Sequence, residues 1–234
     1  MVPGLALAGE QQAAASRSAT VEVLRDRIHG MQDGVPRVPL ATHPALADLV
    51  QLRTGGSYQV DTASLALALL AGPSRAGAWA AVVGADDFGA EAAAEMGVDL
   101  SRTVLVPDPG ELWLEVTSAL VDVVTVVVLR PPAAISARAA SRVAARLRKR
   151  SAALVSWGSW PGAEATLTLR ESRWSGADHG HGRLHSRRVL VDVRRGTAPP
   201  RSAELWLPGQ GLPLGRAAGA ADASLEEALE EALA

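Results

Sequence analysis

The chain has 234 residues, of which 48% are hydrophobic, and its formal net charge is −2. This length supports one sizeable core, and the composition is that of a folded globular protein. The absence of Cys excludes disulfides, thiolate catalysis and Cys-ligated zinc. The basic residues are 22 Arg and one Lys, Lys149, which no Gly immediately precedes. A conventional P-loop ATPase, which needs a Gly-Lys pair, is therefore excluded.

The sequence also favours a soluble, cytoplasmic protein without a membrane segment. The first basic residue after the N-terminus is Arg17, so the basic region of a signal peptide is missing, and the apolar stretch Val2–Ala8 is too short for one. Apolar runs such as Val123–Leu129 are far shorter than the ~20 residues of a membrane span.

The chain is expected to begin with a flexible segment, 1–18, and a helix within 19–34. Val21, Leu24 and Ile28 recur there at helical spacing. Two interpretations are open: these side chains contact a partner protein, or they pack on their own domain.

Residues 35–208 are expected to form the core. Short apolar strands alternate there with helices, which predicts a mostly parallel sheet flanked by helices. The predicted strands are Ala78–Val83, Thr103–Val106, Val123–Leu129 and Ala153–Ser156, and the predicted helices are Ala63–Leu70, Ala90–Met96, Glu111–Leu120 and Ile135–Arg150. Three later segments alternate in polarity and predict an antiparallel C-terminal extension: Thr166–Leu169, Arg187–Val193 and Glu204–Leu207.

Residues 55–62 have the spacing of a phosphate-binding loop but lack its main residues. In the frame Gly55-x-x-x-x-Val60-Asp61-Thr62, Val60 replaces the second Gly and Asp61 replaces the Lys. Reversing that charge at about 4 Å and an effective dielectric near 20 disfavours a phosphate charge by up to about 8 kcal/mol. The alternative interpretation is a simple turn before a helix.

The order of segments resembles the RecA recombinase core over roughly residues 20–208. The segment Gly84–Leu100 resembles the one that begins with the RecA catalytic Glu, and Ala85 occupies that position here. Val121–Val124 resembles the start of the strand that ends in a Mg²⁺-binding Asp, but this strand runs to Leu129 and Arg130 with no carboxylate. The two RecA loops that bind DNA look shortened, which argues against strand exchange.

Within that superfamily the chain resembles the ImuA-like mutagenesis accessory proteins of actinobacteria. The similarity lies in the degenerate loop, in Leu129–Pro132, in Trp157–Gly162, and in Arg170–Trp174 followed by Arg187–Val193. It implies a RecA-like fold, no enzymatic activity, no cofactor, and a role in error-prone DNA synthesis. The implied partners are an inactive Y-family polymerase-like subunit, with RecA as a further candidate. The fold also resembles SulA-type division inhibitors, so FtsZ binding is one alternative, and a residual ATPase or recombinase is another.

A basic stripe lies in the fourth predicted helix. Arg138, Arg142, Arg146 and Arg150 recur every four residues, and no acidic residue occurs from Arg130 to Gly162. The stripe is either a surface for single-stranded DNA or an acidic partner, or the solvated face of an amphipathic helix.

Smaller clusters have similar alternatives. The side chains of Trp157, Trp160 and Trp174 either stack on bases or pack in the core or an interface. Asp178, His179, His181 and His185 lie close together in sequence, but the lack of a second carboxylate and of Cys argues against a metal site. Asp86 and Asp87 are either an acid pair or, for Asp86, a helix cap.

Residues 209–234 are expected to be a linker and an acidic tail. Ser224 and Glu227 have capping-box spacing, and Leu225, Leu229 and Leu233 recur every four residues. Three outcomes are open for this segment: it frays, it binds a partner groove, or its Glu residues contact the Arg stripe.

Overall fold

The computed structural model describes residues 36–178, 181–207 and 214–216, and for 176–186 it describes at most the backbone. The chain divides into two units, Met1–Val38 and Pro39–Ala234, and the fold below is that of the second. The helix predicted within 19–34 and the tail predicted within 209–234 lie outside the described residues, apart from Leu214 to Arg216.

The second unit is built on one sheet. In the described residues its strands lie in the order β3-β2-β4-β5-β1-β6-β7-β8-β9. The first six are mutually parallel where they pair, and β6 to β9 pair antiparallel. The strands are β1 (Ser57–Val60), β2 (Ala80–Val83), β3 (Thr103–Val106), β4 (Val126–Leu129), β5 (Ala153–Trp157), β6 (Ala165–Asp178), β7 (His181–Arg194), β8 (Arg201–Leu207) and β9 (Gly215–Arg216).

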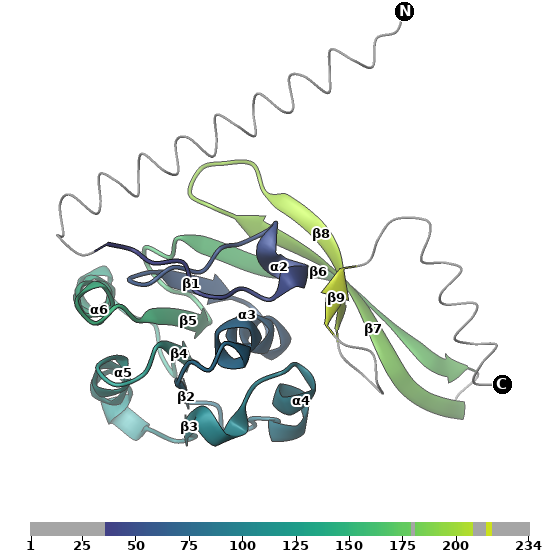
Figure 1. The fold of residues 1–234 in the computed structure, drawn as a ribbon, viewed down its shortest axis with the longest axis horizontal. Helices are drawn as coiled ribbons and strands as arrows, with labels where there is room; N and C mark the ends of the chain where they lie inside the picture. Colours follow the sequence, from purple (N-terminus) through teal and green to yellow (C-terminus); the bar gives the residue numbers. More distant parts are fainter. Residues whose placement is uncertain (1–35, 179–180, 208–213, 217–234) are drawn as a thin grey trace, which may run out of the picture. The chain divides into compact units, whose positions relative to one another are not determined.

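Helices cover both faces of the parallel part of the sheet (Figure 1). They are α2 (Pro44–Ala47), α3 (Ala63–Arg75), α4 (Ala90–Glu95), α5 (Trp113–Val121) and α6 (Ala137–Arg150). Helices α3 and α4 lie on one face, and α5 and α6 lie on the other (Figure 1). The predicted mixed α/β class, with a mostly parallel sheet, flanking helices and an antiparallel C-terminal part, is confirmed.

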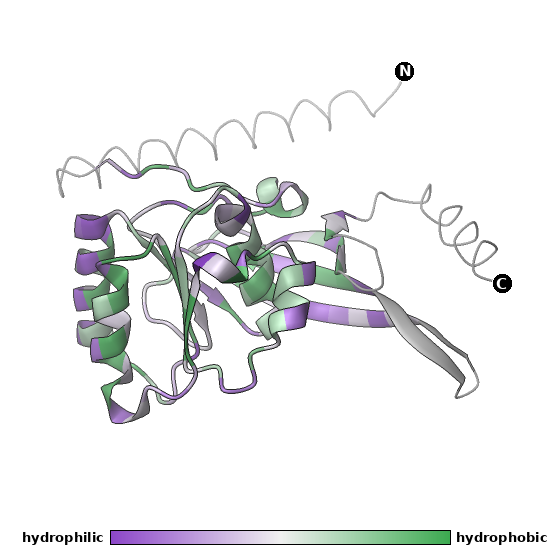
Figure 2. Ribbon diagram, turned by 60° about the horizontal axis from the view of Figure 1, so that its bottom comes forward, coloured by the Kyte–Doolittle hydropathy of each residue, from purple (hydrophilic) through white to green (hydrophobic). Residues whose placement is uncertain are grey.

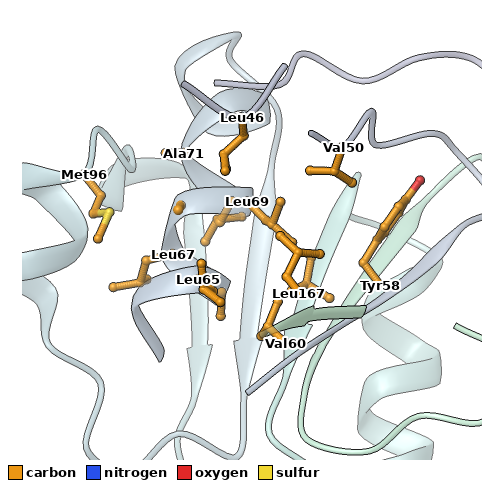
Figure 3. Close-up of a cluster of buried hydrophobic side chains, with 14 of the residues drawn as sticks. Leu46, Val50, Tyr58, Val60, Leu65, Leu67, Leu69, Ala71, Met96 and Leu167 are labelled. Atoms are coloured by element: carbon orange, nitrogen blue, oxygen red, sulfur yellow. The ribbon is translucent and has the colours of Figure 1, made fainter. Parts of the chain in front are cut away.

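Two hydrophobic clusters form the core, one on each side of the sheet. The first joins α3 to the inner face of β1, β6, β7 and β8, and includes Leu46, Tyr58 and Leu167 (Figure 3). The second joins α5 and α6 to the opposite face through residues such as Val143 and Trp160. Each sheet face thus buries its side chains against a helix layer, which fixes the strands between the layers.

Helix α3 is apolar around most of its circumference, and its residues from Leu65 to Ser74 are all buried. The Thr62 hydroxyl accepts a hydrogen bond from the Leu65 amide at 3.4 Å and caps the first turn. The predicted end at Leu70 was wrong, because the helix continues through Pro73 to Arg75. A Cβ added to Gly72 would lie 2.6 Å from the Ala41 carbonyl oxygen, so this Gly allows the helix to approach the preceding segment closely.

Two other boundaries differ from the predictions. Val121 and Asp122 end helix α5, and β4 starts only at Val126, so Val121–Val124 is not the beginning of a strand. The antiparallel hairpin is longer than predicted, since β6 and β7 are paired from Thr166↔Arg194 out to Asp178↔His181. Among the helices that the structure describes, none has the length and apolarity needed to cross a membrane.

Candidate functional site

The degenerate phosphate-loop frame is not a loop in the structure. Ser57–Val60 is strand β1, which pairs in parallel with β5 on one side and β6 on the other. Only Asp61 and Thr62 connect it to α3. Four of the eight residues of the frame thus belong to a strand, and only Asp61 and Thr62 lie between that strand and the helix. A loop that wraps its amides around a phosphate needs several residues between strand and helix, and this connection has two.

Gly55, Val60 and Thr62 of that frame make contacts that hold the fold together. Gly55 has a φ of +77°, and its amide donates to the Ala152 carbonyl at 2.7 Å. A Cβ on Gly55 would meet Arg148 Cγ at 2.8 Å, so packing against the end of α6 requires the Gly. Val60 is buried in the first core cluster, and Thr62 caps α3.

Asp61 joins the end of β1 to β6. Its two carboxylate oxygens lie 3.2 and 3.0 Å from the Leu169 amide nitrogen, which donates to them. The β1–β6 pairing ends at Val60↔Leu167, so this side chain continues the contact where the backbone ladder stops. A carboxylate is an acceptor only, which suits a backbone amide and repels a phosphate.

Two positions from the RecA comparison lie at the carboxyl ends of strands. Ala85 directly follows Gly84 after β2 and is buried, and Leu129 ends β4 and is also buried. Neither side chain can act as an acid, a base or a metal ligand. The connections after β4 and β5 are short, 130–136 and 158–164.

The basic stripe is exposed on α6, but half of it is neutralised. Arg146 donates to Asp122 through Nε at 2.7 Å, and Arg150 donates to the same carboxylate at 3.1 Å. The hydrogen bond from Arg146 is the main reason why the pKa of Asp122 falls to about 2. Arg146 and Arg150 are therefore compensated by an acid that lies outside the acid-free run from Arg130 to Gly162.

Arg138 and Arg142 form no ion pair within the described part of the chain. Arg142 borders a groove of about 370 Å³ between α5 and α6, whose apolar wall includes Leu114 and Val143. In Figure 2 the helices at the left of the view carry both hydrophilic and hydrophobic residues. The stripe thus keeps two cations, Arg138 and Arg142, without a carboxylate partner in the described residues, and Arg142 lines a groove of mixed polarity that also contains Glu115.

A larger cavity of about 770 Å³ lies at the carboxyl ends of β2, β3 and β4. It is lined by Gly84, Asp86, Pro107, Asp108, Pro109, Gly110, Glu111, Trp113, Pro132 and Ala133. The chain leaves β2 for α4 on one face and β4 for α6 on the other, and such a crevice is the usual ligand position in open parallel sheets. The acidic, Pro-rich turn after β3 was the sequence signal for this cavity, and the sequence-based predictions did not include it.

Asp86 was expected either to cap a helix or to form an acid pair. The N-cap of α4 is Gly89, without a side-chain cap, so the helix-cap interpretation was wrong. Instead, Arg130 pairs with Asp86 at 3.5 Å and with Asp87 at 2.8 Å. The two acids therefore share one guanidinium.

The three Trp side chains singled out in the sequence are not together. Trp160 is buried in the second core cluster, and Arg130 stacks on Trp157 at 4.4 Å from the ring centre. Trp174 is on the β6–β7 hairpin and is 54% exposed. Trp160 is thus a core residue, whereas Trp174 is available to a ligand.

The side chains of Asp178, His179, His181 and His185 are outside the described part of the structure. The same holds for Val21, Leu24 and Ile28 near the N-terminus and for Leu225, Leu229 and Leu233 near the C-terminus. The described residues contain no cluster of three His, Asp or Glu side chains that could hold a metal ion.

Comparison with known proteins places the parallel part of the fold in a family. The uncharacterized protein Rv3395c of Mycobacterium tuberculosis is 42% identical over 109 residues, which are 46% of this chain and 53% of that protein. The chain thus spans about half of the length of this relative. The family model described as the MT3502 N-terminal domain matches residues 45–162, half of the chain, from α2 to the connection after β5. The chain therefore belongs to the family that carries the MT3502 N-terminal domain.

Proposed function

We propose that this protein is a catalytically silent adaptor with a RecA-like core that acts in error-prone translesion DNA synthesis during the DNA-damage (SOS) response. Its partners would be an inactive Y-family polymerase-like subunit and RecA. The protein would act by presenting surfaces, with no bond made or broken. The resemblance to ImuA-like accessory proteins supplies this role and these partners.

The observation that carries the proposal is the contact between Asp61 and the Leu169 amide. The connection between β1 and α3 is the place where a RecA-like enzyme would hold triphosphate. Here that connection has two residues, and its carboxylate binds the protein's own backbone. A binding role without nucleotide turnover fits this arrangement better than an ATPase does.

An apolar sheet edge supports a protein-binding role. Strand β3 is the last strand on its side of the sheet, and Val104 and Leu105 on it are 37% and 45% exposed. Trp79, just before β2, and Leu100, just before β3, are exposed as well. Exposed apolar side chains on an unpaired edge strand are typical of a contact surface, because natural proteins otherwise protect such edges with charge.

A pull-down with purified partners tests the proposal. The tagged full chain is expected to retain the polymerase-like subunit, RecA or both, and Leu105→Arg is expected to reduce retention at least tenfold, because a charge would be buried at the edge. The control is Thr197→Arg, which adds the same charge in the exposed turn between β7 and β8.

Two results would contradict the proposal. One is no retention of either partner by the wild-type chain. The other is that the chain instead prevents FtsZ sedimentation at equimolar concentration, which would favour a SulA-like inhibitor.

A further inference from the structure

Three Arg side chains stack on Trp rings in the described residues, and the stack of Arg187 on Trp174 differs from the other two in its lack of a counter-charge. Arg130 on Trp157 is paired with Asp86 and Asp87. Arg188 lies 5.7 Å from the centre of the Trp206 ring, and Arg187 lies 5.1 Å from the centre of the Trp174 ring.

Arg188 on β7 donates to Glu204 on β8 through Nε at 3.0 Å, so a carboxylate of the neighbouring strand neutralises its charge. Arg187 donates instead to two neutral hydroxyls, to Ser172 Oγ at 2.8 Å and to Ser64 Oγ at 3.1 Å. It forms no ion pair with any side chain that the structure describes. Arg187 is therefore the one stacked Arg of the three without a carboxylate partner in that set.

Partial burial makes the missing counter-charge costly. Arg187 is half-buried, and desolvation lowers the pKa of its guanidinium. A desolvated cation that is bonded only to neutral groups gains strongly from an anion. Two of its five N–H donors are used by Ser172 and Ser64, which hold the group in place and leave donors for a ligand.

Trp174 stands directly across the hairpin from Arg187. The two are register partners in β6 and β7, beyond the part of β6 that pairs with β1. Trp174 remains 54% exposed although Arg187 stacks on it, and the neighbouring Arg173 is largely exposed as well. Hydrophilic residues dominate this part of the hairpin (Figure 2), so the exposed indole is not part of an apolar core.

We infer that Trp174 and Arg187 form a binding site for single-stranded nucleic acid, in which a base stacks on the exposed indole and a backbone phosphate accepts hydrogen bonds from the guanidinium. An aromatic face beside an Arg is the usual arrangement for binding unpaired bases, because every base offers a π-face and every nucleotide a phosphate. An acidic peptide would use the Arg but not the indole.

This site is separate from the other surfaces of the protein. Ser64 ties Arg187 to α3, whereas the basic stripe lies on α6 across the sheet (Figure 1). It is also outside residues 45–162, which match the family model. The inference goes beyond the adaptor proposal and stands without it.

Fluorescence anisotropy of the full chain with labelled 20-nucleotide dT and rU strands tests the site. Trp174→Ala and Arg187→Ala are each expected to weaken binding of at least one strand by about tenfold. Trp174→Phe should restore affinity to within about threefold, since a phenyl ring still stacks. Arg187→Ala should also reduce the slope of log affinity against log salt by about 0.7 for each phosphate that the variant no longer binds.

Arg188→Ala is the matched control, because it removes the same charge from the next residue of β7, where Glu204 already neutralises it. We expect less than a twofold change. Far-UV circular dichroism checks that each variant is folded.

Three outcomes would overturn the inference: no saturable binding of either strand at low salt, equal losses in Arg187→Ala and Arg188→Ala, or unchanged affinity in folded Trp174→Ala. Competition by poly-Glu at the same charge concentration as the DNA would also overturn it, because it would indicate an acidic-peptide site.

Discussion

The Leu69→Ala variant is expected to lose about 2–5 kcal/mol of the free energy of unfolding. Leu69 is 1% exposed and lies inside the first core cluster, between α3 and the sheet (Figure 3). Removing its branched methyl groups deletes buried apolar surface and leaves a cavity that the surrounding side chains fill only in part. Urea denaturation followed by circular dichroism measures the loss.

Leu112→Ala is the control for this variant. Leu112 is 63% exposed, so the same truncation is expected to change the free energy of unfolding by about 0.5 kcal/mol or less. Similar losses in both variants would mean that α3 does not pack on the sheet as described.

The Gly84→Ala variant is expected to lose about 2–5 kcal/mol. Gly84 follows β2 with a φ of +76°, which costs an L-residue about 1–2 kcal/mol. The added Cβ would also clash with the Arg130 carbonyl oxygen, and overpacking of this kind costs about 1–3 kcal/mol more. Thermal and urea melts of the purified variant measure the sum.

Gly110→Ala separates the two contributions. Gly110 has a φ of +58°, and an added Cβ there would meet no atom within 4 Å. This variant should therefore show only the backbone term, about 1–2 kcal/mol. Equal losses at the two positions would contradict the close approach of the chain segments that follow β2 and β4.

The regular part of the fold could be predicted where local signals agree. The strand Thr103–Val106 was predicted with its observed bounds, because its apolar run lies between clear turn residues. Helix α6 was predicted to within two residues, since Ala139, Val143 and Leu147 recur at helical spacing. Its cap, Ser136, accepts from the Ala139 amide at 3.2 Å.

Contacts between distant segments could not be predicted. Strand β1 has four residues and follows Gly55 and Gly56, and its strand character comes from pairing with β5 and β6 on either side. The partner of Arg146, Asp122, lies before β4 and outside the acid-free run, so the sequence window around the stripe did not contain it. The hairpin beyond Leu169 has little alternation of polarity, and its length depends on pairing with β7.

The measurement that tests the central claim most directly is a titration of the full chain with a fluorescent ATP analogue and Mg²⁺. The account predicts no saturable binding up to millimolar nucleotide, because Asp61 and Thr62 provide neither a phosphate loop nor a cation. Saturable binding at micromolar nucleotide would contradict the account.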